Sequence, residues 1–191
     1  AFALRSGNHV VISNSPALNV GAGTGFSIEL WYNPLNPMYP LVEWNSGTGT
    51  QGVYLATSTT RGPNYLEANF VDTEGNSHVM LSPSLPFVPN QWRHIAVSYD
   101  KTSGRALMLV SGVLVTETNL GSFTPRTTGN LYLGYRPPGN YPGSDTRING
   151  FIDEVAVYGR ALNTTELRCL MRAGAAGKIP QLADCVFPTD S

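Results

Sequence analysis

Two adjacent carboxylates, Asp153 and Glu154, interrupt an otherwise apolar segment at residues 149–158. Burying an unpaired carboxylate costs several kcal/mol, so a core strand keeps such residues only where they have a partner. Because side chains alternate along a strand, we expect the two acids on opposite faces, one toward solvent and the other toward a cation or backbone donors. Carboxylate oxygens are hard ligands of the kind that calcium prefers.

Catalysis would need groups that the sequence does not supply in a suitable pattern. Glycoside hydrolysis uses two carboxylates across a cleft, about 5–9.5 Å apart, but Glu67, Asp72 and Glu74 are close only in sequence, and the last two belong to a turn. No nucleophile elbow is present, and no Gly-rich phosphate loop precedes a helix. His94 lies in mid-strand and is expected to be packed or exposed. We therefore predict that the protein is not an enzyme.

Aromatic residues in predicted loops could form a sugar-binding surface, because a ring face packs on sugar C–H groups while a polar tip hydrogen-bonds hydroxyls. The segment 135–147 is long and contains three prolines, and loops on a rigid scaffold often carry function. The candidate ligand-binding residues are Trp44, Tyr65, Tyr135, Arg136, Asn140, Tyr141 and Asp145. Trp31 and Trp92 lie within regular strands, so we expect them to pack in or over the core.

The composition excludes several classes of protein. Charged residues make up 13% of the 191 residues, about half the usual ~25%. The 12 basic and 13 acidic residues give a net charge of −1, so no face for nucleic acid is indicated. No apolar run reaches the ~18 residues of a membrane-spanning helix. The chain begins with Ala1, without a signal-peptide pattern, so we expect a processed or excised product.

The C-terminal region contains both cysteines and a helix signal. Cys169 and Cys185 are spaced so that a disulfide could join the tail to the helix, at roughly 3 kcal/mol in the chain-entropy model; two buried free thiols are the alternative. A disulfide would indicate an oxidising compartment. Asn163 is the acceptor position of an Asn-Thr-Thr glycosylation sequon. It is also a predicted N-cap, with Glu166 three residues later, for a helix that runs to about residue 173.

Short β signals recur along the whole chain, as is typical of an all-β sandwich. Residues 26–34 and 92–100 alternate apolar and polar side chains, and Ser111-Gly112 forms a two-residue hairpin turn. We expect about eleven to thirteen strands and one short C-terminal helix. One domain, residues 1–178, is expected to be followed by a tail, residues 179–191, that a disulfide joins to it.

Five segments resemble those of laminin G-like, concanavalin A-like lectin/glucanase domains, in the same order and at the same spacing. They are FSIELWYNP at 26–34, WRHIAVSYD at 92–100, LMLVSGVLV at 107–115, LYLGY at 131–135 and NGFIDEVAVYGRALNTTEL at 149–167. The resemblance spans about residues 1–178. It implies an all-β jelly roll of two antiparallel sheets with one short C-terminal helix, the fold of legume lectins, pentraxins and many carbohydrate-binding modules.

Domains of this family often hold one structural calcium ion. The resemblance implies Asp153 as the lead ligand, with the Gly7 backbone and the Asn8 side chain as companions. Arg5 stands close to where the family opening often has an acid, which puts the site in doubt. The alternative is that Asp153 pairs with Arg5 or accepts backbone N–H groups.

The resemblance also implies a function class. We expect a non-catalytic, extracellular, lectin-like module, secreted or at the cell surface, that binds a glycan. The alternative is a structural, adhesion or assembly module whose partner is a neighbouring extracellular protein. Nucleic acid and membrane insertion are not expected, and the oligomeric state stays open.

Overall fold

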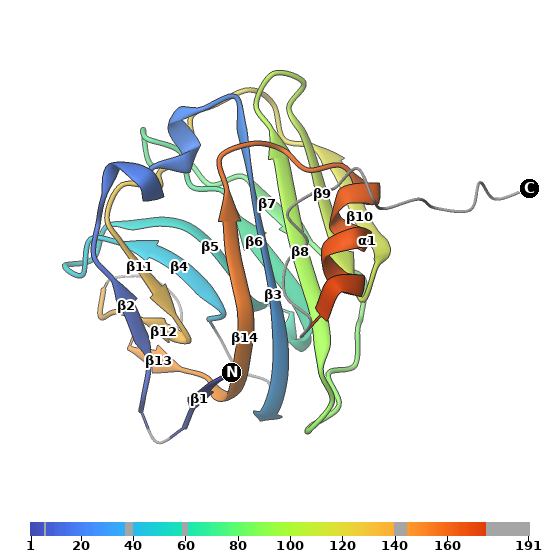
Figure 1. Ribbon diagram of the computed structural model, residues 1–191. Helices are drawn as coiled ribbons and strands as arrows, with labels where there is room; N and C mark the ends of the chain where they lie inside the picture. The colour runs from blue at the N-terminus through green and yellow to red at the C-terminus, as the bar shows by residue number, and fades with distance from the viewer. Residues whose placement is uncertain (6, 37–39, 59–60, 140–144, 175–191) are drawn as a thin grey trace, which may run out of the picture.

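A computed structural model of the chain describes residues 1–5, 7–36, 40–58, 61–139 and 145–174. Two antiparallel sheets lie face to face and form a jelly-roll sandwich (Figure 1), as the sequence predicts. The first sheet has the order β1 (Phe2–Leu4), β14 (Asn149–Tyr158), β3 (Gly25–Asn36), β8 (Arg93–Asp100), β9 (Arg105–Val110), β10 (Val113–Asn119). The second has the order β2 (Val10–Ile12), β11 (Asn130–Leu133), β4 (Val42–Asn45), β5 (Gln51–Ser58), β6 (Gly62–Asn69), β7 (Val79–Leu81).

Smaller elements complete the described chain. A two-stranded ladder is formed by β12 (Tyr135–Arg136) and β13 (Thr146–Arg147). Two 3-10 turns, η1 (Pro16–Leu18) and η2 (Val20–Ala22), precede β3, and the α-helix α1 (Thr164–Ala173) follows β14. None of the helices among the described residues has the length and apolarity needed to cross a membrane.

The core lies between the two sheets and follows the predicted alternation. Phe26, Ile28, Leu30 and Tyr32 of β3 are fully buried in it. The neighbouring strand β8 pairs with β3 in register and adds its own apolar residues, Ile95 among them, to the same layer. Each strand therefore turns one face inward and leaves an outer face, directed away from the other sheet, for polar residues, the helix or a ligand.

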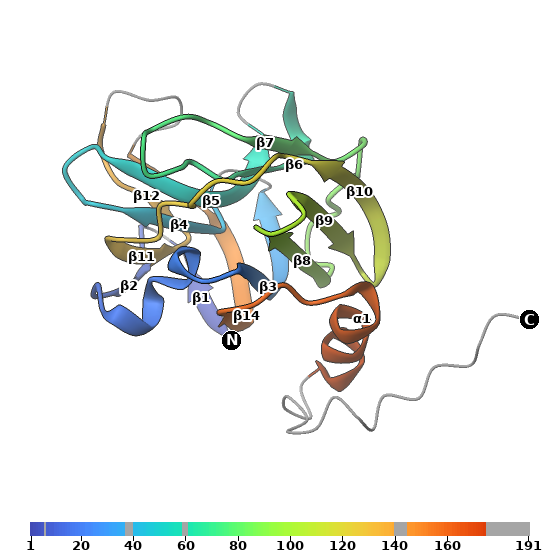
Figure 2. The same cartoon turned by 90° about the horizontal axis from the view of Figure 1, so that it is seen from above.

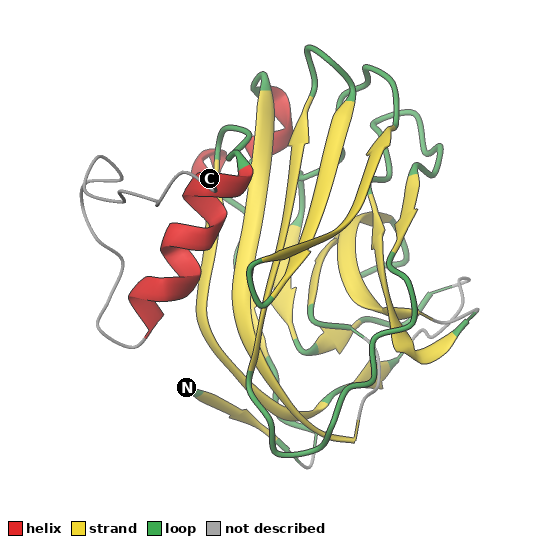
Figure 3. Ribbon diagram, turned by 90° about the vertical axis from the view of Figure 1, so that its right-hand side faces the viewer, coloured by secondary structure: helices red, strands yellow, loops and turns green. Residues whose placement is uncertain are grey.

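The helix α1 covers part of the outer face of the first sheet (Figures 2 and 3). Leu162, Leu167 and Leu170 pack there against a second apolar cluster contributed by β8 and β9. The predicted capping box is confirmed: the Asn163 side chain accepts the Glu166 N–H at 2.9 Å, and the Glu166 carboxylate accepts the Asn163 N–H at 2.9 Å. The second apolar cluster is built on β8 and β9, and Leu114 of β10 and Tyr158 of β14 pack against it.

Candidate functional site

A cavity of about 340 Å³ opens on the outer face of the first sheet, beside the end of α1. The described residues that line it are Trp31, Trp92, Asp153, Glu154 and Gly174. They come from β3, from the segment just before β8, from β14 and from the C-cap of the helix. Segments far apart in the sequence therefore meet at one place on the sandwich.

A β-bulge in β14 brings the two carboxylates to this cavity. Asp153 pairs with Trp31 and Ala156 with Glu29, so β14 has one more residue than β3 in this interval. Glu154 has φ = 49°, a left-handed conformation that non-glycine residues rarely adopt. The bulge breaks the alternation. The prediction that Asp153 and Glu154 lie on opposite faces is therefore wrong, since both line one cavity.

The tryptophans form the aromatic part of the site. Trp92 is 42% exposed, and its ring centroid lies 6.3 Å from that of Phe151. Trp31 is half-buried and meets His94 edge-on at 5.4 Å. The sequence predicts that these rings pack in or over the core; neither belongs to the core between the sheets, and both lie on the outer face of the first sheet. The sequence contains a signal for this placement. In the two alternating strands both tryptophans fall on the side that carries Glu29, His94 and Ser98, which is the polar side.

Buried polar groups lie next to these rings. His94 Nε2 is 2.9 Å from the Glu29 carboxylate, and both side chains are about 1% exposed. The Tyr158 hydroxyl donates to Glu29 at 3.4 Å; burial, with the Glu29 charge, raises the pKa of Tyr158. By contrast, His94 Nδ1 and Asn33 Oδ1 are buried without a hydrogen-bond partner. Such groups are uncommon in folded proteins and call for an explanation.

The outer face of the second sheet carries a denser polar network. Arg136 Nε donates to Glu43 Oε2 at 2.6 Å, and the two side chains are 1% and 0% exposed. Asn45 Nδ2 donates to the other Glu43 oxygen at 2.8 Å. The Arg136 guanidinium also lies 4.2 Å from the centre of the Tyr54 ring. Burial raises the pKa of Glu43, although the adjacent Arg136 charge acts in the opposite direction.

A second carboxylate continues this network across β5 and β6. Glu67 accepts hydrogen bonds from the Tyr54 hydroxyl at 2.6 Å and from the Ser58 hydroxyl at 2.8 Å. Burial and the Glu67 hydrogen bond raise the pKa of Tyr54 to about 12. Each carboxylate on this face thus has at least two donors from the chain itself.

The predicted ligand-binding residues do not form one surface. Arg136 is buried in the ion pair with Glu43. Tyr135 donates to Asp145 at 3.1 Å, and its ring contacts Arg147 and His9. Asp145 is well exposed and also pairs with Arg147 at 3.2 Å.

Three further candidates are placed separately or not at all. Tyr65 is half-buried on β6. Tyr135 and Arg136 form β12, which contacts β4, and β5 lies between β4 and β6. Tyr65 is therefore separated from these two candidates. Asn140 and Tyr141 lie outside the described residues.

The prediction that Trp44 belongs to a ligand-binding loop is wrong. It lies in β4, not in a loop, and is fully buried in the core between the sheets. Alternation explains the placement, because Val42 and Trp44 point inward while Glu43 points outward to Arg136. Its ring is therefore not accessible to a ligand.

The predicted calcium ligands are not brought together. Leu4 pairs with Gly150 and Phe2 with Ile152, so the turn with Gly7 and Asn8 follows one end of β1 and Asp153 lies at the other. Three residues along a strand separate the two ends by about 10 Å. Asp153 Oδ1 instead lies 3.1 Å from the Ala1 amino group and accepts the Glu154 N–H at 3.0 Å.

Arg5, the alternative partner, lies 4.5 Å above the Phe151 ring. No group of three His, Cys, Asp or Glu suited to a metal occurs among the described residues. Calcium binding stays a prediction, and these three positions do not fit it.

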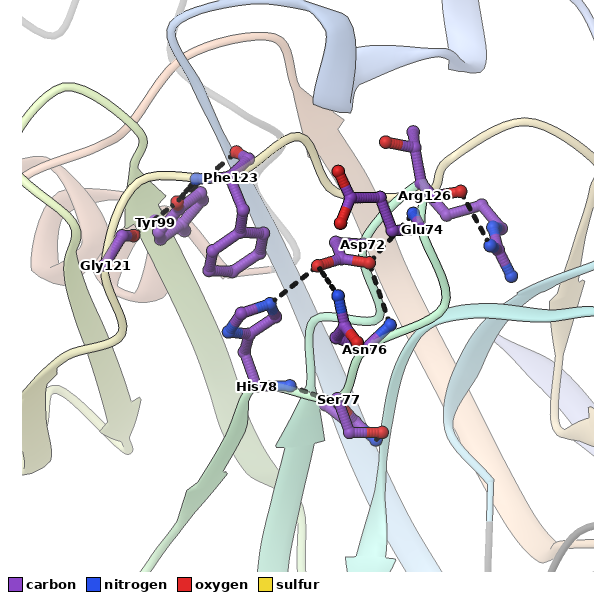
Figure 4. Close-up of polar contacts among 11 residues, drawn as sticks. Asp72, Glu74, Asn76, Ser77, His78, Tyr99, Gly121, Phe123 and Arg126 are labelled. Carbon is purple, nitrogen blue, oxygen red and sulfur yellow. Dashed lines mark hydrogen bonds and ion pairs between the residues drawn. The ribbon is translucent and has the colours of Figure 1, made fainter.

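A third polar cluster, at one end of the sandwich, contains two of the acids surveyed for catalysis (Figure 4). Asp72 Oδ1 accepts the N–H groups of Glu74 and Asn76, and Oδ2 lies 3.0 Å from His78 Nε2. His78 stacks on Phe123 at 3.6 Å. These bonds, above all the one to His78, lower the pKa of Asp72. Asp72 thus holds a turn together, and Glu74 is exposed to solvent.

The remaining predicted sites are only partly placed. Cys169 is buried on α1, whereas Cys185 and the tail 179–191 lie outside the described residues, so the disulfide stays a prediction. Asn163 is exposed at the helix N-cap, and its glycosylation likewise stays a prediction.

Comparison with solved structures finds the same fold in carbohydrate-binding domains and in the binding domains of toxins. The Ruminococcus gnavus IT-sialidase CBM40 bound to alpha2,3 sialyllactose has 16% sequence identity and a TM-score of 0.64, over 86% of this chain and 96% of that one. A putative carbohydrate binding protein from Bacteroides ovatus has 20% identity and a TM-score of 0.63, over 84% and 44%. The binding domain of Botulinum neurotoxin serotype G has 15% identity and a TM-score of 0.63, over 88% and 41%. The chain thus spans less than half the length of the last two.

At these identities the likeness shows the fold alone. No curated protein matches the sequence. The family model of the concanavalin A-like lectin/glucanases superfamily, however, matches residues 4–168, in agreement with the five segments and with the two-sheet jelly roll. The chain therefore belongs to the concanavalin A-like lectin/glucanase superfamily.

Proposed function

We propose that this protein is a non-catalytic carbohydrate-binding module whose ligand site is the cavity between Trp31 and Trp92. One observation carries the proposal: Trp92 is 42% exposed beside a cavity that also contains Trp31 and two carboxylates. Indole rings pack on the C–H face of a sugar, and carboxylates accept hydrogen bonds from its hydroxyls. A cavity of about 340 Å³ is also within the range of small-molecule sites, ~300–1,000 Å³.

Two of the similar structures support the same class of function, since one is a CBM40 domain bound to alpha2,3 sialyllactose and the other is a putative carbohydrate binding protein. The arrangement of acids argues against hydrolysis. Asp153 and Glu154 are adjacent on one bulge, whereas glycoside hydrolases place two carboxylates on either side of the scissile bond. Glu43 and Glu67 are buried and hydrogen-bonded within the chain. The proposal includes an extracellular location, where glycans and disulfides are common.

The test is a glycan array with the full chain, followed by calorimetry on Trp92→Ala and Tyr65→Ala. Both variants remove a partly exposed aromatic ring from the outer face of a sheet, but only Trp92 lines the cavity. We expect saturable binding of at least one glycan, an affinity loss of about tenfold or more in Trp92→Ala, and no more than about a twofold loss in Tyr65→Ala.

Two outcomes would overturn the proposal. A loss of binding in Tyr65→Ala but not in Trp92→Ala would move the site to the second sheet. Absence of binding at high protein concentration, together with self-association on sizing, would favour the assembly function instead.

A further inference from the structure

The N-cap of α1 carries a sequence motif that the proposed function does not use. Asn163-Thr164-Thr165 is the only Asn-X-Ser/Thr sequence in the 191 residues, and this motif is the acceptor for N-linked glycosylation in secreted proteins. Asn163 is also the residue that caps the helix. The two roles conflict only if both need the same atom of its side chain.

The capping box uses the oxygen of the Asn163 side chain and not its nitrogen. Oδ1 accepts the Glu166 N–H at 2.9 Å, while the Asn163 backbone N–H donates to the Glu166 carboxylate at 2.9 Å. None of the described residues accepts a hydrogen bond from Nδ2, and Asn163 is exposed, with an extended backbone. An N-glycosidic amide keeps its carbonyl oxygen, so a sugar on Nδ2 leaves the cap intact.

Thr165, the third residue of the motif, forms no hydrogen bond with a described residue that would explain its hydroxyl. Its side chain is exposed in the first turn of α1. A β-branched residue is a poorer helix former than alanine, so helix formation does not by itself favour threonine at this position. The acceptor motif gives a reason for the hydroxyl that the helix does not.

Another cavity on the outer face of the first sheet, about 210 Å³ in volume, lies beside this residue. Its described lining includes Asn163 itself, the apolar Leu107 and Ala161, and the charged Asp100 and Arg105. Apolar groups pack on the C–H face of a sugar, while carboxylate and guanidinium groups hydrogen-bond its hydroxyls. A volume below the ~300 Å³ of typical small-molecule sites suits a single sugar unit.

We propose that Asn163 carries an N-linked glycan whose first sugar lies in this cavity. In the transfer, Nδ2 attacks the anomeric carbon of an oligosaccharide that is activated as a diphosphate. The new Nδ2–C1 bond replaces the C1–O bond to phosphate, the diphosphate leaves with the electron pair of that bond, and Nδ2 loses one proton. Oδ1 takes no part in this step, so it continues to accept the Glu166 N–H.

The glycosylation site is separate from the proposed ligand site. The cavity between Trp31 and Trp92 lies beside the other end of α1, at Gly174. The helix between the two ends has ten residues, which corresponds to about 15 Å. The two cavities have no described lining residue in common, so the first sugar on Asn163 does not occupy the ligand site.

The test is to secrete the full chain, behind an added leader, from a cell line whose N-glycans stay high-mannose. We expect its intact mass to exceed that of Asn163→Asp by one glycan, and N-glycosidase treatment to remove the excess. Thr165→Val keeps the shape of the side chain without the hydroxyl and should abolish the modification, whereas Thr165→Ser should retain it. A secreted chain without a glycan on Asn163 would overturn the proposal.

Urea unfolding tests where the first sugar lies. An endoglycosidase that leaves one N-acetylglucosamine gives a single-sugar form, whereas Asn163→Asp has no sugar but keeps an oxygen that caps the helix. We expect the intact and single-sugar forms to unfold at about the same urea concentration, and both at a higher one than Asn163→Asp. Equal midpoints for all three forms, or a gain that is lost with the outer sugars, would overturn the placement in the cavity.

Discussion

The outer faces of the two sheets differ in how their buried polar groups are paired. On the second sheet, the Glu43 carboxylate has Arg136 and Asn45 as donors, and Glu67 has Tyr54. On the first sheet, His94 pairs with Glu29 through one nitrogen only, and Asn33 Oδ1 has no partner. Large aromatic surface is also exposed on the first sheet, at Trp92.

This difference separates a structural network from the cavity that we propose as a ligand site. A network whose donors and acceptors satisfy one another gains stability and specifies one arrangement, but it leaves little for a ligand to replace. Buried acceptors without a partner, such as those of Asn33 and His94, instead lower the stability of the folded protein. The second sheet therefore anchors Arg136, at the base of the 135–147 segment, and the first sheet carries the cavity that we propose as the ligand site.

The largest expected effect is on the second sheet. Arg136→Ala would leave Glu43 as an uncompensated buried charge, so we expect the free energy of unfolding to fall by about 3–5 kcal/mol. The control is Arg105→Ala, which breaks an ion pair with the same 2.6 Å separation, but with side chains 51% and 44% exposed. That change should cost about 0–1 kcal/mol. Urea unfolding measures both, and equal losses would mean that burial does not distinguish the two pairs.

The same substitution, Asn to Leu, can be made on each sheet, and we expect smaller changes in stability from it than from Arg136→Ala. Asn45→Leu removes the donor to Glu43 and the acceptor of the Gly47 N–H, so it should cost about 1–3 kcal/mol. Asn33→Leu removes an oxygen that has no partner, so stability should stay within about 1 kcal/mol of the wild type.

In a binding assay neither variant should lose glycan affinity as Trp92→Ala does, because neither Asn33 nor Asn45 is among the described residues that line the cavity. Urea midpoints and calorimetry on the same preparations provide the check. A larger stability loss in Asn33→Leu than in Asn45→Leu would contradict the assignment of the two faces.

Local sequence patterns predicted most of the fold because they depend on neighbouring residues. The alternation of 26–34 placed Phe26 and Ile28 in the core, and the Asn163–Glu166 capping box fixed the start of α1. Ser111 and Gly112 have φ values of 49° and 78° at the predicted turn. Each of these features is local to a few residues of the chain.

The candidate site was less predictable because its determinants are not local. The bulge falls at Glu154 with φ = 49°, where no glycine marks a left-handed position in the sequence. The exposure of Trp92 depends on which part of the sheet α1 covers, which is a tertiary property. Trp44 was assigned to a loop although the alternation of β4, with Glu43 outward, already indicated that it points inward.

The smallest expected effect concerns the turn at Asp72, where a carboxylate is held by chain donors as on the second sheet but close to solvent (Figure 4). Its pKa is lowered in the folded protein from an ordinary value of 3.8. A lowered folded-state pKa adds stability above the unfolded-state pKa, and this contribution is lost as the pH falls through that value toward the folded one.

We therefore expect the urea midpoint of the wild type to decrease below about pH 4, and the difference between the wild type and Asp72→Asn to shrink over the same range. Glu74→Gln, in the same turn but exposed, should follow the wild type. If the difference between the wild type and Asp72→Asn instead stayed constant below about pH 4, the bonds from His78 and Asn76 would not depend on the charge of Asp72. The hydrogen bonds to Asp72 would then fix its position without stabilising its charge. In that respect the turn would differ from the second sheet, where chain donors satisfy each carboxylate.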